Sequence, residues 1–173
     1  MKVTLFMAIS LNGIIARESN EEDFLSNENW QTLVKLSHRT GCVIWGHKTH
    51  EIVRTWEKKY WNEIKDIRKV IVGLNSIKNL EKDCMQATSP KDAIHKLTEE
   101  NFKEILLSGG STLNSSFIKE GLVDEIIMNI EPTIIGKGIP VFKFEDFADV
   151  RLKLLDMKKL EEGIVQLDYK VLK

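Results

Sequence analysis

The segment Leu106-Leu107-Ser108-Gly109-Gly110-Ser111-Thr112-Leu113 carries the strongest structural signal of this chain. An apolar run stops at two adjacent glycines, and a helix-like pattern follows at once. Because glycine has no Cβ, the backbone can turn tightly there and a ligand can lie against it. The first N–H groups of the following helix are free and partly positive, which suits a phosphate or pyrophosphate. A glycine pair between a strand and a helix is also a common plain turn, so this segment alone leaves both interpretations open.

Apolar runs typical of strands alternate with amphipathic stretches typical of helices along most of the chain. The last two predicted strands flank Glu161-Glu162-Gly163, and the clean alternation of the second indicates an antiparallel hairpin. This order predicts one α/β domain over residues 1–173, with a mostly parallel central sheet, helices on both faces and an antiparallel C-terminal hairpin. The predicted strands are 3–9, 42–45, 70–72, 105–107, 123–130, 150–160 and 164–172, and helices are expected over 27–39, from 47, from 90 and over 112–120.

Three of the predicted strands end in glycine, at Gly46, at Gly73 and at Gly109-Gly110. In a parallel sheet these carboxyl ends share one edge, and ligands bind beyond that edge. The three glycine ends together therefore favour a nucleotide site. His47 and Lys48 follow the first of them and could supply cations or donors to a phosphate, although both are also ordinary surface residues.

The composition restricts the classes of partner. Among 173 residues, 42% are hydrophobic and 29% charged, and Lys+Arg 25 against Asp+Glu 26 gives a net charge of −1. No strong basic field is available for nucleic acid or an anionic membrane, and no apolar run approaches the ~20 residues of a membrane span. Cys42 and Cys84 are the only cysteines, and no Cys/His cluster has metal-ligand spacing. We therefore expect a cytoplasmic protein with reduced thiols, no metal, no nucleic-acid partner and no membrane partner.

Five segments together resemble the dihydrofolate reductase superfamily, and more closely the reductase domain of riboflavin biosynthesis and its stand-alone relatives. The resemblance implies a dihydrofolate reductase-like fold. It also implies a reduced nicotinamide cofactor, usually NADPH, and hydride transfer to a pterin or a pyrimidine-like ring. The segments are Ser10-Leu11-Asn12-Gly13-Ile14-Ile15-Ala16, Gly46-His47-Lys48-Thr49, Leu107 to Leu113, Gly121-Leu122-Val123-Asp124-Glu125 and Pro132 to Gly138.

The same resemblance implies which residues bind the cofactor. The glycine turn and the helix after it would meet the pyrophosphate, and the Gly46 segment would cradle phosphates. Residues after the third strand would flank the adenosine half, and the first strand and first loop would border the nicotinamide. Carried over residue by residue, the set is Ala8, Ile15, Ala16, Gly46, His47, Lys48, Thr49, Leu74, Asn75, Ser76, Ser108, Gly109, Gly110, Ser111, Thr112 and Leu113.

The expected substrate residues lie on the first strand and the first helix. Reduction of an imine carbon needs a proton on nitrogen, which a buried carboxylate can supply. In dihydrofolate reductases an acid near the start of the first helix has this role. Counting from the first strand places it at Glu28, whereas counting back from Gly46 places it at Trp30. We predict Glu28, with Asp23 in reserve, although an acid in a first helical turn also complements the helix dipole. The predicted substrate set is Phe6, Met7, Ala8, Glu28, Leu33 and Val34, of which Leu33 and Val34 are equally consistent with core positions.

Some positions depart from the family pattern. Asp23-Phe24-Leu25-Ser26 stands where dihydrofolate reductases carry a Trp and a Pro, and Ser108 stands where riboflavin reductases commonly have a Glu. The first helix also lacks the arginine pair that would hold a ribose phosphate. We expect an NADPH-dependent reductase of a small molecule, either dihydrofolate or a related dihydropterin. The alternatives are 5-amino-6-(5-phosphoribosylamino)uracil reduction and a non-catalytic nucleotide-binding module, and a homodimer is left open.

Overall fold

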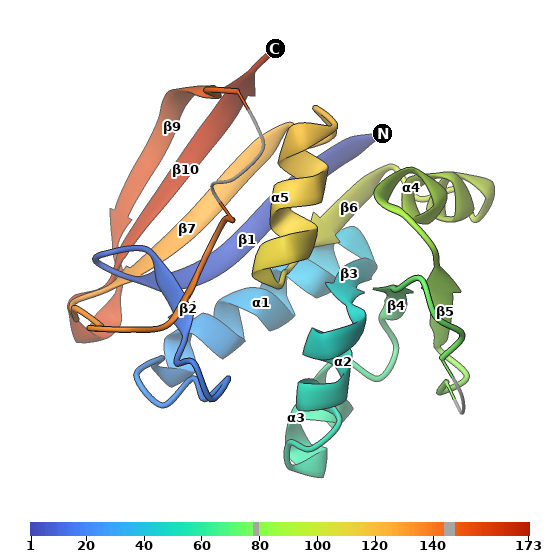
Figure 1. The fold of residues 1–173 in the computed structure, drawn as a ribbon, viewed down its shortest axis with the longest axis horizontal. Helices are drawn as coiled ribbons and strands as arrows, with labels where there is room; N and C mark the ends of the chain where they lie inside the picture. The colour runs from blue at the N-terminus through green and yellow to red at the C-terminus, as the bar shows by residue number, and fades with distance from the viewer. Residues whose placement is uncertain (78–79, 144–147) are drawn as a thin grey trace.

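The computed structural model describes residues 1–77, 80–143 and 148–173. Within them, an eight-stranded sheet has the order β5-β4-β3-β6-β1-β7-β10-β9 (Figure 1). The strands from β5 to β7 are mutually parallel, and β10 runs antiparallel to both of its neighbours. The bounds are β1 Lys2–Ser10, β3 Cys42–Gly46, β4 Arg68–Val72, β5 Cys84–Ala87, β6 Glu104–Leu107, β7 Glu125–Glu131, β9 Arg151–Lys159 and β10 Val165–Leu172.

The central strands are buried on both faces, which explains why their sequences are continuously apolar. In β3, Cys42 and Ile44 belong to the hydrophobic cluster on one face of the sheet. Val43 and Trp45 belong to the cluster on the other face. The side chains of a strand alternate between faces, so four consecutive apolar residues supply two cores.

Helices cover both of these faces (Figure 1). Trp30 and Leu36 of α1 pack into the same cluster as Val43 and Trp45, whereas Phe117 of α5 packs into the opposite one. The bounds are α1 Asn27–Thr40, α2 His47–Val53, α3 Lys58–Glu63, α4 Pro90–Glu99 and α5 Ser111–Lys119. Among the described residues, no helix is both long and apolar enough to cross a membrane.

The predicted α/β architecture is confirmed, including the mostly parallel sheet and the C-terminal antiparallel hairpin. The start of α4 forms as its sequence indicates, because Ser89 Oγ accepts a hydrogen bond from the Asp92 N–H at 3.1 Å and Pro90 opens the helix. The turn at 161–163 is a short 3₁₀ helix, η1 Glu161–Gly163.

Several short elements were not predicted. The strand β5 and the helix α3 lie in stretches without a clear period, and their apolar side chains are held by tertiary contacts. A two-stranded sheet joins β2 Ile14–Ala16 to β8 Ile139–Pro140, and neither of these strands is among the predicted elements. A Cβ on Gly138 would lie 2.4 Å from the carbonyl oxygen of Ala16. This close approach gives that glycine its structural role.

Candidate functional site

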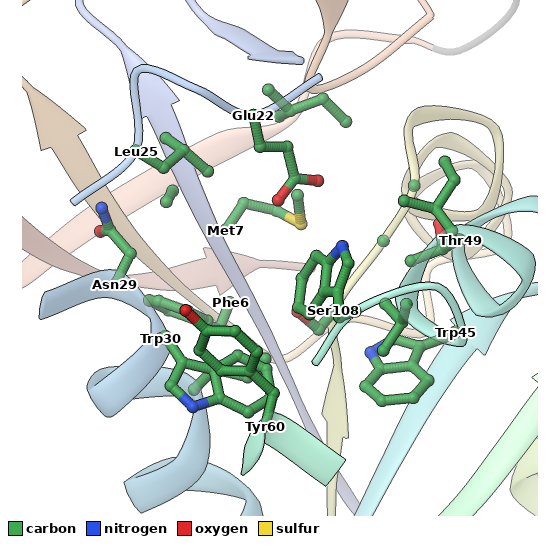
Figure 2. A pocket seen from close by; sticks show the side chains of 18 of the residues that line it. Phe6, Met7, Glu22, Leu25, Asn29, Trp30, Trp45, Thr49, Tyr60 and Ser108 are labelled. Atoms are coloured by element: carbon green, nitrogen blue, oxygen red, sulfur yellow. The ribbon is translucent and has the colours of Figure 1, made fainter. Parts of the chain in front are cut away.

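A cleft of about 600 Å³ lies beyond the carboxyl ends of β1, β3 and β6. Its walls come from these strand ends, from α1 and α2, and from the segments before α1 and after α2 (Figure 2). The sheet edge predicted from the glycine pattern is therefore the edge that carries the cleft. Phe6, Met7, Trp45, Ser108 and Gly110 all contribute to its lining.

The glycine strand ends meet at this edge. The Gly46 N–H donates a hydrogen bond to the carbonyl oxygen of Gly109 at 2.8 Å. A Cβ on Gly109 would lie 3.1 Å from Met7 Sδ, and one on Gly110 would lie 3.2 Å from Thr49 Oγ1. Gly109 also has φ +83°, which side chains with a Cβ rarely adopt. The turn therefore requires glycine for both conformation and space.

The start of α5 fits an anionic group. No acid lies in its first turn, and the buried hydroxyl of Ser111 has no hydrogen-bond partner within the described part of the chain. Buried polar atoms are usually paired, so a free donor at a helix N-terminus suits a phosphate oxygen. The residues at this turn are thus compatible with the pyrophosphate of a nicotinamide cofactor.

The strand β1 extends into the cleft. Its pairing with β6 ends at Leu5 and Leu107, whereas its pairing with β7 continues to Ser10. Beyond Leu5, the edge of β1 on the β6 side is therefore not covered by a strand. Met7 and Ala8 lie on this stretch and line the cleft, which leaves backbone groups in position for a ligand.

An aromatic wall closes one end of the cleft. Trp30 packs edge-on against Trp56 and Tyr60, with ring centroids 5.6 and 5.1 Å apart, and the Trp56 and Tyr60 centroids are 5.8 Å apart. The Trp30 indole N–H donates to the Glu63 carboxylate, which satisfies its polar edge. Figure 2 shows Trp30 and Tyr60 together below Phe6. Such a wall suits a planar ring.

Glu22 supplies a carboxyl group to the cleft. The residue is exposed as a whole, but its side chain enters the cleft and points toward Met7 (Figure 2). Burial of this carboxyl group raises its pKa from 4.5 to about 7. A group with this pKa is partly protonated near neutral pH, so it can donate a proton as a general acid.

Asp23, the alternative proton-donating acid predicted from the sequence, binds Arg17 instead of entering the cleft. Its carboxylate accepts hydrogen bonds from Arg17 Nε at 2.6 Å and Arg17 Nη2 at 2.9 Å. The Arg17 hydrogen bond lowers the pKa of Asp23. Asp23 does not line the cleft. It instead ties together the two ends of the loop that carries Glu22.

Glu28, the residue predicted to supply the proton, is half-buried in the first turn of α1 and does not line the cleft. The neighbouring Asn29 does line it, and its amide donates to the buried carboxylate of Glu131. The same carboxylate accepts the Ser26 N–H at 2.8 Å, and Asn129 donates to the Asn29 oxygen at 3.0 Å. The start of α1 is thus held to β7 by a buried polar network.

The remaining predicted residues either line the cleft or lie outside its lining. Leu33 lines the cleft, whereas Val34 packs into the neighbouring hydrophobic cluster. Leu74 is 88% exposed, and Asn75 and Ser76 are exposed beyond β4. Predicted cofactor residues that line the cleft are Ala8, Ile15, Thr49, Ser108, Gly109 and Gly110, and those that lie outside its lining are Ala16, Gly46, His47, Lys48, Ser111, Thr112 and Leu113.

Sequence reasoning missed Glu22, Trp56 and Tyr60. The signal for the aromatic wall was present, because all four tryptophans lie between residues 30 and 61. Glu22 is one of several acids in a polar stretch, and nothing in the local pattern distinguishes it. Its orientation depends on how the 17–25 loop folds back over β1.

Comparison with known proteins places this geometry in a family. Uncharacterized protein YwjB of Bacillus subtilis (strain 168) is 28% identical over 171 residues, which cover 97% of each chain. The structure of a protein assigned to riboflavin biosynthesis in Shewanella sp. PV-4 superposes with a TM-score of 0.81 at 20% identity over the whole of both chains. A pyrimidine reductase-like protein from Corynebacterium diphtheriae gives a TM-score of 0.79 at 17% identity, covering 99% of this chain and 92% of the other. These two structures share the fold. The family model described as RibD C-terminal domain matches residues 1–166, and the chain therefore belongs to this family of reductase-like domains.

Proposed function

We propose that this protein is an NADPH-dependent reductase of a planar nitrogen heterocycle of the pyrimidine class. The observation that carries the proposal is one cleft that joins the Gly109-Gly110 turn to the carboxyl group of Glu22. The turn offers a site for a dinucleotide, and the carboxyl group offers the proton that a reduced imine needs. Membership in the RibD C-terminal domain family supports the same class of reaction.

In this proposal, NADPH supplies a hydride to the carbon of a C=N bond when it is bound. The turn at Gly109-Gly110 and the Ser111 hydroxyl hold its pyrophosphate, and Lys48 and His47 lie beyond the cleft for its 2′-phosphate. The uncovered edge of β1 at Met7 and Ala8 orients the nicotinamide and the substrate ring. The aromatic wall of Trp30, Trp56 and Tyr60 excludes water from the ring.

Glu22 handles the proton. Its protonated carboxyl group donates to the nitrogen as the adjacent carbon receives the hydride, so the C=N bond becomes CH–NH. Glu22 is left ionised and regains a proton from solvent through the exposed loop. Glu57, the other acid of the cleft lining within the described residues, is paired with Lys59 at the surface. It is therefore the weaker candidate.

The chemistry of the cleft also bears on the substrate. Among the described residues that line it, none is Lys or Arg. A phosphate or a glutamate tail on the substrate would find no cation there, and the anion site at the Gly109-Gly110 turn would be taken by the cofactor pyrophosphate, which favours an uncharged ring substituent. The family favours a pyrimidine over dihydrofolate, and the lining favours a dephosphorylated form of the aminouracil over its 5-phosphate.

The test is NADPH oxidation followed by absorbance, with four substrates: the ribosylaminouracil, its 5-phosphate, dihydrofolate and a dihydropterin without a glutamate tail. We expect the highest kcat/KM for the ribosylaminouracil. A preference for the phosphate would contradict the substrate assignment, and a preference for dihydrofolate would contradict the pyrimidine class.

Glu22→Gln tests the mechanism, with Glu57→Gln as the matched control. Loss of the general acid should lower kcat by roughly 10²–10⁴-fold, while NADPH affinity changes little. Glu57→Gln should retain most of the activity. If wild type binds NADPH but turns over none of the four compounds, the cleft belongs to a non-catalytic nucleotide-binding module instead.

A further inference from the structure

A second cluster of polar side chains lies outside the lining of the cleft. It consists of His50 from α2, Glu81 from the segment before β5, and Cys84 at the start of β5. One ligand atom from each residue lies within 4.8 Å of the others. The sequence does not indicate this cluster, because His50 is 31 positions before Glu81 and the two residues do not form a metal-binding motif of regular spacing.

The polar atoms of this cluster are buried, and His50 Nε2 and Glu81 Oε2 face each other at ion-pair distance. His50 is fully buried, and neither of its ring nitrogens makes a hydrogen bond within the described residues. Glu81 Oε2 is also buried and makes no hydrogen bond there, although it lies opposite His50 Nε2. Buried imidazole and carboxylate groups are normally satisfied, since an unmade hydrogen bond of a buried group is costly. The missing hydrogen bonds therefore point to a further group that both His50 and Glu81 would bind.

The separations suit a metal ion. His50 Nε2 lies 3.3 Å from Glu81 Oε2. Two ligands that are each about 2.0–2.1 Å from a tetrahedral Zn²⁺ are separated by roughly 3.3–3.4 Å. The Cys84 sulfur lies within 4.8 Å of the ligand atoms of His50 and Glu81, and it also contacts Asp83 Oδ1 at 3.9 Å.

The surrounding groups are compatible with a dication. The other oxygen of Glu81, Oε1, accepts from Arg54 Nε at 2.9 Å, which orients the carboxylate with Oε2 toward His50. Asp83 is engaged by the buried ammonium of Lys69, so this pair is neutral. The Trp61 ring packs edge-on against His50 and shields one side. A thiolate and a carboxylate would together balance the charge of Zn²⁺.

We propose that His50, Glu81 and Cys84 form a Zn²⁺ site that joins α2 to β5. The mixed nitrogen, oxygen and sulfur donor set favours Zn²⁺ over Mg²⁺ or Ca²⁺, which prefer oxygen ligands alone. A water molecule completes the tetrahedron. The site is structural: it fixes α2, whose first turn borders the cleft, to the edge of the sheet.

The test uses the whole protein stripped with EDTA and titrated with ZnCl₂ against a chromophoric chelator. We expect one Zn²⁺ per chain and a higher midpoint of thermal unfolding after reloading. Substitution by Co²⁺ should give the visible bands of tetrahedral cobalt and a thiolate charge-transfer band. These readouts do not depend on NADPH or on turnover.

Cys84→Ser should weaken Zn²⁺ binding at least tenfold and remove the charge-transfer band. Cys42→Ser, which changes the other buried thiol, should alter neither. Glu81→Gln provides a second variant at a half-buried position if Cys84→Ser fails to fold, and it should also weaken binding. The proposal is overturned if wild type binds no stoichiometric Zn²⁺, or if Cys84→Ser and Glu81→Gln bind it as tightly as wild type.

Discussion

Arg17 and Asp23 form a two-point ion pair at the surface, with Nε to Oδ1 at 2.6 Å and Nη2 to Oδ2 at 2.9 Å. The pair closes the loop whose inner side carries Glu22. A planar guanidinium bound at two points fixes orientation as well as distance. The exposed pair therefore matters for the position of the acid in the cleft more than for global stability.

Breaking this pair should affect turnover more than folding. In Arg17→Ala, we expect a lower kcat and faster hydrogen exchange of the 17–25 amides, with little change in the midpoint of thermal unfolding, because exposed ion pairs add little stability. Arg39→Ala, at a surface arginine on α1, is the control. Equal kcat values for the two variants would mean that the Arg17–Asp23 pair does not position Glu22.

The raised pKa of Glu22 links stability to pH. Folding moves this pKa from 4.5 to about 7, so between these values the folded state binds more protons than the unfolded state. The contribution of Glu22 to the free energy of unfolding is fully present below pH 4.5 and is lost as the pH rises through about 7. We expect Glu22→Gln to gain stability over wild type at pH 8 relative to pH 4, measured by urea unfolding. A difference between the two proteins that is independent of pH would contradict the buried carboxyl group.

Gly109, in the glycine turn, and Gly121, after α5, allow a matched pair of substitutions. Gly109 and Gly121 both have positive φ, so alanine is conformationally strained at each, by about 1–2 kcal/mol. Only at Gly109 would the new Cβ also approach Met7 Sδ, at 3.1 Å, whereas Gly121 has open space. Both variants should lose stability, but only Gly109→Ala should weaken NADPH binding, measured by fluorescence titration. The same affinity in both variants would remove the turn from the cofactor site.

Lys48 tests the cofactor preference. It is exposed in the first turn of α2, next to Thr49, which lines the cleft, so a 2′-phosphate could reach it. Loss of a charged hydrogen bond of about 1.5 kcal/mol corresponds to roughly tenfold in Kd. We expect Lys48→Ala to raise the Kd for NADPH by this factor and to leave NADH unchanged. Equal losses for the two cofactors would show that Lys48 does not read the 2′-phosphate.

The edge strand β9 tests the homodimer left open by the sequence. Leu152, Leu154 and Met157 are opposite Val171, Tyr169 and Leu167 of β10, so they share one face. Their exposed fractions are 41%, 50% and 65%, and an apolar face on an edge strand favours association. We expect a dimer by sedimentation velocity that Leu154→Lys converts to monomer, while Lys153→Glu on the opposite face does not. A monomeric wild type would contradict this prediction.

The sequence by itself determined the order of the main strands and helices, because buried parallel strands need apolar runs and turns need glycine. It also indicated the sheet edge that carries the cleft, since Gly46, Gly73 and Gly109-Gly110 follow neighbouring strands. These are local requirements, and local residue patterns express them directly.

The tertiary structure alone decided which acid enters the cleft and which groups gather around His50. Glu22, Asp23 and Glu28 are similar in sequence, but Arg17 holds Asp23 outside, the helix keeps Glu28 out of the cleft lining, and only Glu22 is desolvated inside. His50, Glu81 and Cys84 come together only when β4 and β5 pair. Desolvation and ligand geometry depend on residues that are distant along the chain, so no local pattern reveals them.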